Sequence, residues 1–522
     1  MLEPPAPDVD QAPEQPELAH LEDRVPPHLK LSRRAAGCVV GFGLIFAWFV
    51  LKPLWHTDLW GHLAYGRHLA ATGSLPSTEP LIVLSRGMPF VDTAWLWQLL
   101  GYGVFQSLGV AGLQGLASLT ITATCIVLFH RVQQRTRSTL LAWLGVGIFL
   151  ALDWGHLGVV RPQLGGLFCF VVLLHRLTSR QPSRWDWLVV PGLHALWANL
   201  HGSFVVGLAL TGVFLLGRAI DLLRRTGRWT SLLHDQTVRR LLLWLQLSAA
   251  ATLLNPYGLG LYAEVLTLAD NPNLQALTEW QALNFRALHG LAFAGSAVTL
   301  ILLYRWTPRR VASWEGLSLV GIALATFWSA RFSVWWGPIA ALALMMQFHA
   351  VGRRWLPWRA DLEPSPTNGK WSVVCVGMAW IFFAYSPLGM RILHQREPLL
   401  EKAVSAGTPL GVVEWLKKHP PQGLVFNPYE WGDYLQWAGP TGMQVFLNSH
   451  AHLVPRDVWL HYLQIAEQSA DWAETLDRYG VNTVILDKEY REGLIRRLKE
   501  DPNWNVGYED NRGAVFVRRR AI

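Results

Sequence analysis

The chain has 522 residues, of which 51% are hydrophobic and only 16% are charged, against about 25% charged in ordinary globular proteins. Tryptophan occurs 28 times, and its amphipathic ring concentrates where a membrane meets water. The composition therefore excludes a string of ordinary soluble domains and indicates a polytopic membrane protein.

The net charge of +8 would suit a nucleic-acid-binding protein if it formed a basic arm. Instead, residues 1–30 carry 2 basic and 7 acidic residues, residues 31–390 carry 27 and 13, and residues 391–522 carry 16 and 17. The positive excess lies among the hydrophobic segments, where it sets the orientation of membrane proteins. We therefore expect membrane lipids as partners and no nucleic acid.

Residues 1–30 contain seven prolines and few large apolar residues, so we expect a disordered cytoplasmic tail. A transmembrane domain over residues 31–390 follows. A spanning helix needs about 20 predominantly apolar residues. Eleven segments are predicted to span: 35–55, 111–130, 138–155, 161–178, 186–201, 203–222, 240–256, 290–304, 314–330, 332–349 and 371–390.

The basic residues of this region test the span count. With a cytoplasmic N-terminus, 21 of the 27 basic residues in residues 31–390 fall on the cytoplasmic side, as positive-inside orientation requires. We therefore expect a multi-pass protein of the cytoplasmic (inner) membrane. An even number of spans would break this pattern, in which basic residues lie mainly on the cytoplasmic segments between spans.

Two long regions then lie outside the cytoplasm. The first outer loop, residues 56–110, contains two Trp-rich amphipathic stretches, 58–72 and 94–109, which we expect to lie as helices at the membrane surface. Residues 391–522 alternate helical and extended patterns, the latter at 423–426, 444–447, 481–486 and 514–517. We predict an extracytoplasmic α/β domain.

The first outer loop holds the first candidate site residues. Asp58 and His62 follow the first span, and in a helix they would share one face at positions i and i+4. Such a pair could remove a proton from a bound hydroxyl group or hold a divalent metal; a helix N-cap and an interfacial histidine are the alternative. Asp92 begins the second amphipathic stretch and is either a substrate ligand or an N-cap.

Two arginines break the cytoplasmic bias of the basic residues. Arg161 begins the fourth predicted span and Arg331 lies between the ninth and tenth. A cation kept on the outer side of the bilayer suits the phosphate of a lipid-linked substrate. The alternative is snorkelling to lipid head groups.

Further polar residues mark the same side. They are Asn199 and His201 at the outer end of the fifth span, and Glu279 and Trp280 in the loop over residues 255–289. We predict that these residues line a substrate groove together with Asp92. Of the tail residues, Asn427, Glu430, Asp433, Asn448 and His450 cluster at predicted strand ends, where they contact carbohydrate or serve as caps and turns.

Several of these segments together resemble a known superfamily. The segments are Asp58-Leu-Trp-Gly-His62, Gly73-Ser-Leu-Pro-Ser-Thr-Glu-Pro80, Val91-Asp-Thr-Ala-Trp95, Arg161-Pro162, Leu196-Trp-Ala-Asn-Leu-His-Gly202, Asn255-Pro-Tyr-Gly258, Phe426-Asn-Pro-Tyr-Glu-Trp-Gly-Asp-Tyr434 and Arg478-Tyr-Gly-Val-Asn-Thr-Val484. Over residues 35–520 the chain resembles bacterial multi-pass proteins of the GT-C glycosyltransferase superfamily. Relatives usually carry a second Trp where this chain has Gly61.

The resemblance implies a membrane glycosyltransferase that uses a polyprenyl-phosphate-linked sugar from the outer leaflet, with Asp58 as the key catalytic group. The acceptor would be a glycan, a lipid or a protein. His62 would orient Asp58 or hold its charge state. The first loop contains no Asp-x-Asp pair, so the spacing does not imply a metal, and the cofactor stays unknown. The alternatives are a non-catalytic transporter of lipid or glycan, and a membrane scaffold with an outer binding domain.

Overall fold

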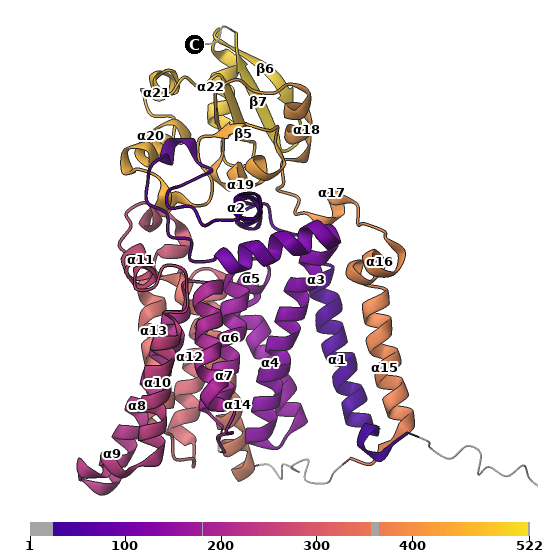
Figure 1. Cartoon of the computed structure of the whole chain (residues 1–522), viewed down its shortest axis with the longest axis vertical. Coiled ribbons are helices and arrows are strands. Elements are labelled where there is room, and N and C mark those ends of the chain that lie inside the picture. Colours follow the sequence, from indigo (N-terminus) through magenta and orange to yellow (C-terminus); the bar gives the residue numbers. More distant parts are fainter. Residues whose placement is uncertain (1–24, 180, 356–364, 520–522) are drawn as a thin grey trace, which may run out of the picture.

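The computed structural model describes residues 25–179, 181–355 and 365–519. A tall bundle of helices carries a smaller mixed domain at one end (Figure 1). The predicted N-terminal tail lies outside the described residues as far as residue 24. Antiparallel pairing of β1 (Leu31–Ser32) with β2 (Thr367–Asn368) ties the start of the first helix to the start of α15.

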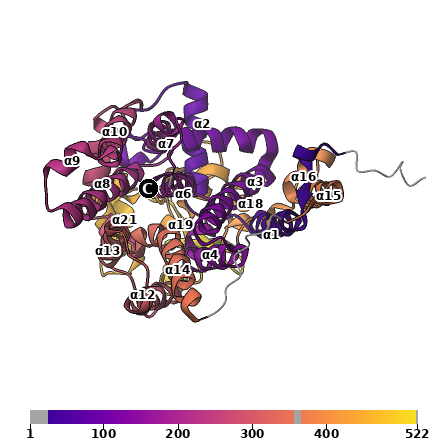
Figure 2. The ribbon, with the colours of Figure 1, turned by 90° about the horizontal axis from the view of Figure 1, so that it is seen from below.

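Each of the eleven predicted spans overlaps a helix. The helices are α1 (Arg33–Val50), α3 (Trp95–Thr136), α4 (Thr139–Leu152), α6 (Gln163–Leu177), α7 (Asp186–Leu200), α8 (Phe204–Thr226), α10 (Gln236–Ala251), α12 (Leu288–Trp306), α13 (Ser313–Trp328), α14 (Ser333–Trp355) and α15 (Gly369–Ala384). Seen from the far end, α1 and α15 form one side of the bundle, and α8, α10 and α13 lie away from them (Figure 2).

Length limits how many of these helices qualify as spans. Among the described residues, five helices are long and apolar enough to cross a membrane, or six if α15 and α16 (Pro387–His394), bent by 86°, count as one. A 14-residue helix such as α4 rises only about 21 Å, against a hydrocarbon core of about 30 Å. The chain is a multi-pass, mainly helical membrane protein, and the number of eleven spans stays a prediction.

Two helices lie across the domain-facing end of the bundle. They are α2 (Leu59–Thr72) and the first part of α3, and they occupy the Trp-rich stretches of the first loop (Figure 1). Gly109 divides α3 because its φ of 61° and ψ of −153° are not helical, a conformation that glycine adopts without steric cost. The crossing part of α3 is thereby separated from the part that runs down the bundle.

The C-terminal domain is built on a five-stranded sheet in the order β4-β3-β5-β7-β6. The strands are β3 (Leu424–Phe426), β4 (Gln444–Val445), β5 (Thr483–Asp487), β6 (Trp504–Glu509) and β7 (Gly513–Arg518). Strands β4, β3 and β5 are parallel, and β7 is antiparallel to β5 and β6. The helices are α17 (Leu400–Ala403), α18 (Leu410–Lys418), α19 (Tyr429–Ala438), α20 (Arg456–Ala466), α21 (Trp472–Arg478) and α22 (Glu492–Glu500). The predicted α/β architecture is present, with β6 as a strand not predicted from the sequence.

The domain is held on the bundle from two sides. On one side α19 packs against α2, and Arg67 of α2 donates to the backbone carbonyls of Gln436 and Trp437 at 3.2 Å each. On the other side Asn273 donates to the carbonyls of Ala451 and Val454 at 2.9 and 2.8 Å. The segment that contains η7 (Ala451–Leu453) is therefore fixed above the helix ends.

Candidate functional site

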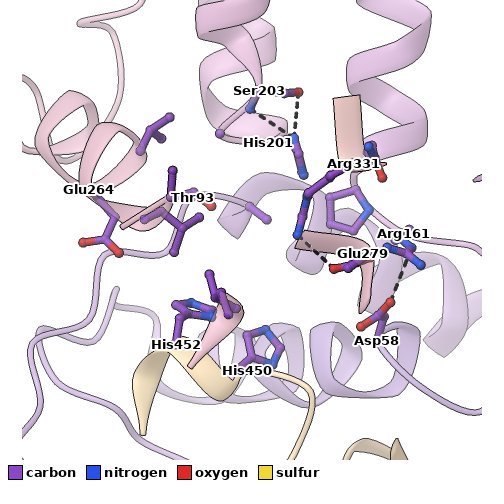
Figure 3. A pocket seen from close by; sticks show the side chains of 18 of the residues that line it. Asp58, Thr93, Arg161, His201, Ser203, Glu264, Glu279, Arg331, His450 and His452 are labelled. Atoms are coloured by element: carbon purple, nitrogen blue, oxygen red, sulfur yellow. Dashed lines mark hydrogen bonds and ion pairs between the residues drawn. The ribbon is translucent and has the colours of Figure 1, made fainter. Parts of the chain in front are cut away.

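A cavity of about 260 Å³ lies between the domain-facing helix ends and the C-terminal domain. Figure 3 shows Asp58, Arg161, Glu279, Arg331 and His201 gathered in one part of it, with His450 and His452 contributed by the C-terminal domain. All predicted site residues except Asn199 line this cavity. Residues as far apart in the sequence as Asp58 and His452 thus line one cavity.

The backbone of Asp58 is unusual. Its φ of 56° is positive, which is uncommon for a residue other than glycine, and its ψ of −64° lies outside the left-handed helical region. Leu59 N donates to Thr57 O at 2.6 Å, which makes Asp58 the centre of a γ-turn, a rare and strained arrangement. Strain of this kind persists where surrounding structure enforces it, and functional sites are where it clusters.

The charged residues form a chain of ion pairs. Arg161 Nε lies 3.3 Å from Asp58 Oδ2, and Arg161 Nη1 lies 3.1 Å from Glu279 Oε2. The other oxygen of Glu279, Oε1, accepts from Arg331 Nη1 at 3.0 Å. Burial alone would raise the pKa of Glu279, but the charges of Arg331 and Arg161 outweigh it and hold the pKa below its ordinary value. Glu279 therefore stays ionised and holds the two guanidinium groups together.

Two short 3-10 helices place these groups. Glu279 and Trp280 belong to η5 (Thr278–Trp280), and Arg331 belongs to η6 (Ala330–Phe332). The guanidinium carbon of Arg331 lies 4.8 Å from the ring centroid of Trp280, within the range of a cation–π contact. Trp280 thus orients Arg331 from the face that Glu279 leaves open.

His201 presents a neutral imidazole to the cavity. Its Nδ1 accepts from Ser203 N at 3.1 Å and lies 2.7 Å from Ser203 Oγ, so the ring proton is on Nε2. Burial, reinforced by the charges of Arg331 and Arg161, lowers the pKa of His201 to about 3. The available Nε2–H can donate to a hydroxyl or phosphate oxygen.

Asp58 and His62 do not form the predicted side-chain pair. Asp58 precedes α2 with non-helical angles, so the i, i+4 geometry does not apply to it; its carboxylate meets Arg161 instead. His62 Nδ1 lies 3.3 Å from Gln98 Nε2, and its ring packs edge-on to His450 with centroids 5.4 Å apart. Burial holds the pKa of His62 well below its ordinary value, so the ring is neutral.

Asp92 lies just before α3 rather than at its N-cap position, which Ala94 occupies. Its Oδ1 accepts from Ala94 N at 3.0 Å and from Gln98 Nε2 at 2.9 Å, whereas Oδ2 is buried without a partner. Burial outweighs these hydrogen bonds and raises the pKa of Asp92 to about 7. Asp92 therefore brings a partly protonated carboxyl group to the cavity.

Asn199 lies outside the cavity, and its side-chain amide is hydrogen-bonded to neighbouring residues. Its Oδ1 accepts from Trp95 Nε1 at 2.9 Å, and its Nδ2 donates to the carbonyls of Ala195 and Leu254 at 2.8 and 2.9 Å. These bonds use the hydrogen-bonding capacity of the amide. Asn199 is absent from the cavity lining, so the structure does not place it in the predicted substrate groove.

The C-terminal domain contributes residues that sequence patterns did not assign to this site. Ser449, His450 and His452 line the cavity, and burial lowers the pKa of His450 to about 4 and that of His452 to about 3. The sequence pattern places His450 only at a predicted strand end and gives no signal for His452. The one available signal was the resemblance of Phe426–Tyr434 to the outer domain of the superfamily, which does not include either histidine.

No three His, Cys, Asp or Glu side chains converge closely enough to hold a metal ion within residues 25–179, 181–355 and 365–519. The carboxylate of Asp58 is instead paired with Arg161. The arrangement can bind an anionic group through two arginines, with a carboxylate and neutral imidazoles beside it.

No known protein family and no curated protein is detectably similar to this sequence. Solved structures are similar in fold. The apo oligosaccharyltransferase of Archaeoglobus fulgidus gives a TM-score of 0.52 at 13% identity over 87% of this chain and 70% of that chain. ArnT from Cupriavidus metallidurans bound to undecaprenyl phosphate gives 0.53 at 14% identity over 92% and 97%. The mycobacterial arabinofuranosyltransferase AftD gives 0.52 at 15% identity over 94% and 40%.

These structures are GT-C glycosyltransferases. The chain therefore has the GT-C fold, as the sequence resemblance implied. At identities of 11 to 15% the likeness establishes the fold of a multi-pass membrane protein and leaves its reaction to be argued from the site.

Proposed function

We propose that this protein transfers a sugar from a polyprenyl-phosphate donor to an acceptor on the outer face of the cytoplasmic membrane. The observation that carries the proposal is the pair Arg161 and Arg331, held together by Glu279 beside Asp58. Two fixed guanidinium groups match a phosphate, and a carboxylate next to them is available for the acceptor proton.

The fold neighbours support this choice of donor. One ArnT structure contains undecaprenyl phosphate, and the archaeal oligosaccharyltransferase AglB is described in complex with an inhibitory peptide and a dolichol-phosphate. Both ligands carry a phosphate on a polyprenyl chain. A donor of the same class suits this cavity, whose lining is charged near Arg161 and apolar along Val205, Val206, Val265 and Leu268.

The reaction exchanges one bond to the sugar for another. The acceptor oxygen attacks the anomeric carbon of the sugar, the bond from that carbon to the phosphate oxygen breaks, and the lipid phosphate leaves with the bonding electrons. Asp58 takes the proton of the attacking acceptor hydroxyl group. Arg161 and Arg331 stabilise the charge that develops on the phosphate, which is the step where preorganised cations contribute most.

The ion-pair chain suggests how the base is released. Arg161 contacts both Asp58 and Glu279 in the ligand-free cavity. A phosphate that binds Arg161 competes with Asp58 for the guanidinium group, while the two-sided contact of Glu279 keeps the arginines in place. Donor binding thus frees the Asp58 carboxylate to accept a proton. His201 Nε2–H and Asp92 Oδ2 are then left to bind hydroxyl groups of the sugar.

The transporter alternative has less support from the site, because its charged residues lie outside the long helices: Arg161 precedes α6, Glu279 is in η5 and Arg331 is in η6. The proposal is tested with purified protein in lipid nanodiscs, a lipid-linked sugar fraction extracted from the source membranes as donor, and an extract of the envelope glycans, lipids and proteins of the same cells as acceptor. Free polyprenyl phosphate is measured by mass spectrometry. Wild type should release the lipid phosphate, and Asp58→Asn should lose at least 100-fold in rate. Full release by Asp58→Asn would sink the assignment.

A further inference from the structure

Asp433 of α19 lies against the backbone of the turn that carries Asp58. We propose that Asp433 is a positioning residue, through which the C-terminal domain sets the conformation of the catalytic carboxylate. The inference rests on the proposed function and adds a role for a residue that does not itself line the cavity. It concerns residues 375 positions apart in the sequence.

The first observation is a hydrogen bond to the strained residue itself. Asp433 Oδ2 accepts from Asp58 N at 2.8 Å. The Asp58 N–H lies in the γ-turn closed by Leu59 N and Thr57 O. A carboxyl oxygen is a strong acceptor for this N–H, and a residue in a sparsely populated region persists only where such contacts hold it. Asp433 therefore supplies the external restraint that such a turn needs.

The second observation is steric and independent of the first. A Cβ atom built on Gly61 would lie 2.3 Å from Asp433 Oδ1 and 3.0 Å from Asp433 Cγ. A side chain at position 61 would therefore require Asp433 to move. The absence of a Cβ at Gly61 leaves the space above the first turn of α2 to the Asp433 carboxyl group.

The third observation concerns the rigidity of Asp433. The side chain is fully buried, and α19 is fastened to the first loop by the two bonds from Arg67 and by Gln436 Nε2, which donates to Leu81 O at 2.9 Å. Burial, with a smaller contribution from the charge of Asp58, raises the pKa of Asp433 to about 7. A docked C-terminal domain thus presents a fixed acceptor to Asp58, whatever ligand enters the cavity.

The functional consequence is a dependence of catalysis on docking of the domain. With the bond in place, the Asp58 side chain faces Arg161. Without it, the turn can relax toward an ordinary helix start, which rotates the carboxylate away from the arginine. A displacement of about 1 Å of a reacting group can reduce a rate by about 100-fold, so the loss should fall on kcat rather than on donor affinity.

The test compares Asp433→Ala with Asp433→Asn in the purified full chain. The asparagine side-chain oxygen can still accept from Asp58 N, so this variant should keep kcat within about threefold of wild type. Asp433→Ala should lower kcat by about 100-fold and change the Kd for undecaprenyl phosphate by less than threefold. Thr475→Ala, which truncates another buried side chain of the same domain, is the matched control and should keep kcat.

A second pair of variants tests the contact without relying on the first. Gly61→Ala should lower kcat at least 30-fold in the wild-type chain, because its methyl group meets the Asp433 carboxyl group. In the Asp433→Ala background the same change should have less than a threefold effect. Equal effects of Gly61→Ala in both backgrounds would overturn the proposed contact.

The outcomes also separate this inference from the proposed function. Asp433→Ala with wild-type kcat, or Asp433→Asn as inactive as Asp433→Ala, overturns the positioning role. A parallel loss of kcat and of undecaprenyl phosphate binding in Asp433→Ala overturns it as well, since that indicates a collapsed cavity. If Asp58→Asn keeps full activity, the proposed function fails whatever the Asp433 variants show.

Discussion

Replacement of Arg161 by methionine is the sharpest single perturbation of the ion-pair chain. The guanidinium group lies 3.3 Å from Asp58 and 3.1 Å from Glu279. At an effective dielectric constant of about 20, each contact corresponds to about 5 kcal/mol of Coulomb attraction. The side chains of Arg161, Asp58 and Glu279 are 22, 25 and 42% exposed, so solvent screening and desolvation reduce each contact well below this value. For donor binding we take about 3 kcal/mol for the loss of one guanidinium–phosphate contact, about 150-fold in affinity.

The assay is the affinity of the purified protein, in nanodiscs, for undecaprenyl phosphate. Undecaprenol serves as the ligand without phosphate, and wild type should bind it far more weakly. Arg161→Met should bring the affinity for undecaprenyl phosphate close to that for undecaprenol. Arg286→Met removes an exposed arginine from the same loop region as Glu279 and should leave the affinity unchanged. If both arginine variants lose the same affinity for undecaprenyl phosphate, or if Arg161→Met loses none, Arg161 makes no specific contact with the phosphate.

Three further predictions follow from single contacts. Trp280→Ala removes the ring beneath Arg331 and should weaken undecaprenyl phosphate binding by about 3- to 30-fold; Trp306→Ala, with an exposed ring, is its control. Asn273→Ala leaves the carbonyls of Ala451 and Val454 without donors and should lower the unfolding free energy by about 1 to 3 kcal/mol, measured by thermal denaturation. Folding raises the pKa of Asp92 to about 7, so its ionisation destabilises the fold as pH rises from about 4 to 7. The unfolding free energy of Asp92→Asn should therefore rise by about 2 kcal/mol relative to that of wild type between pH 5 and pH 8. A difference that stays constant with pH would contradict the raised pKa.

Local sequence patterns predicted most of the architecture. Apolar runs predicted helices at eleven places, and alternating patterns in the tail predicted four of the five strands of its sheet, because both depend on periodicities of a few residues. Strand β6 was not predicted because Trp504–Glu509 is mostly exposed and carries little apolar alternation. Helix length was harder to predict, since apolar sequence continues past helix ends at positions such as Leu253 and Leu254.

The site was predicted only in part, for the same physical reason. Orientation along the chain singled out Arg161, Glu279 and Arg331 as polar groups on one side, and the fold brings them together. Asn199 fitted the same criterion but is used in packing. The contact of Asp433 with Asp58 depends on docking between a loop and a domain far apart in sequence, and no periodicity encodes such a contact.

The proposed glycosyl transfer is tested most directly in cells of the source organism that carry Asp58→Asn in place of the wild-type residue. Mass spectrometry of lipid extracts and of envelope glycans reads out both sides of the proposed reaction. We predict that the variant accumulates one polyprenyl-phosphate-linked sugar and that one envelope glycan loses a single sugar mass. An unchanged lipid-linked pool together with unchanged glycans, at normal levels of folded Asp58→Asn protein, would contradict the proposed glycosyl transfer.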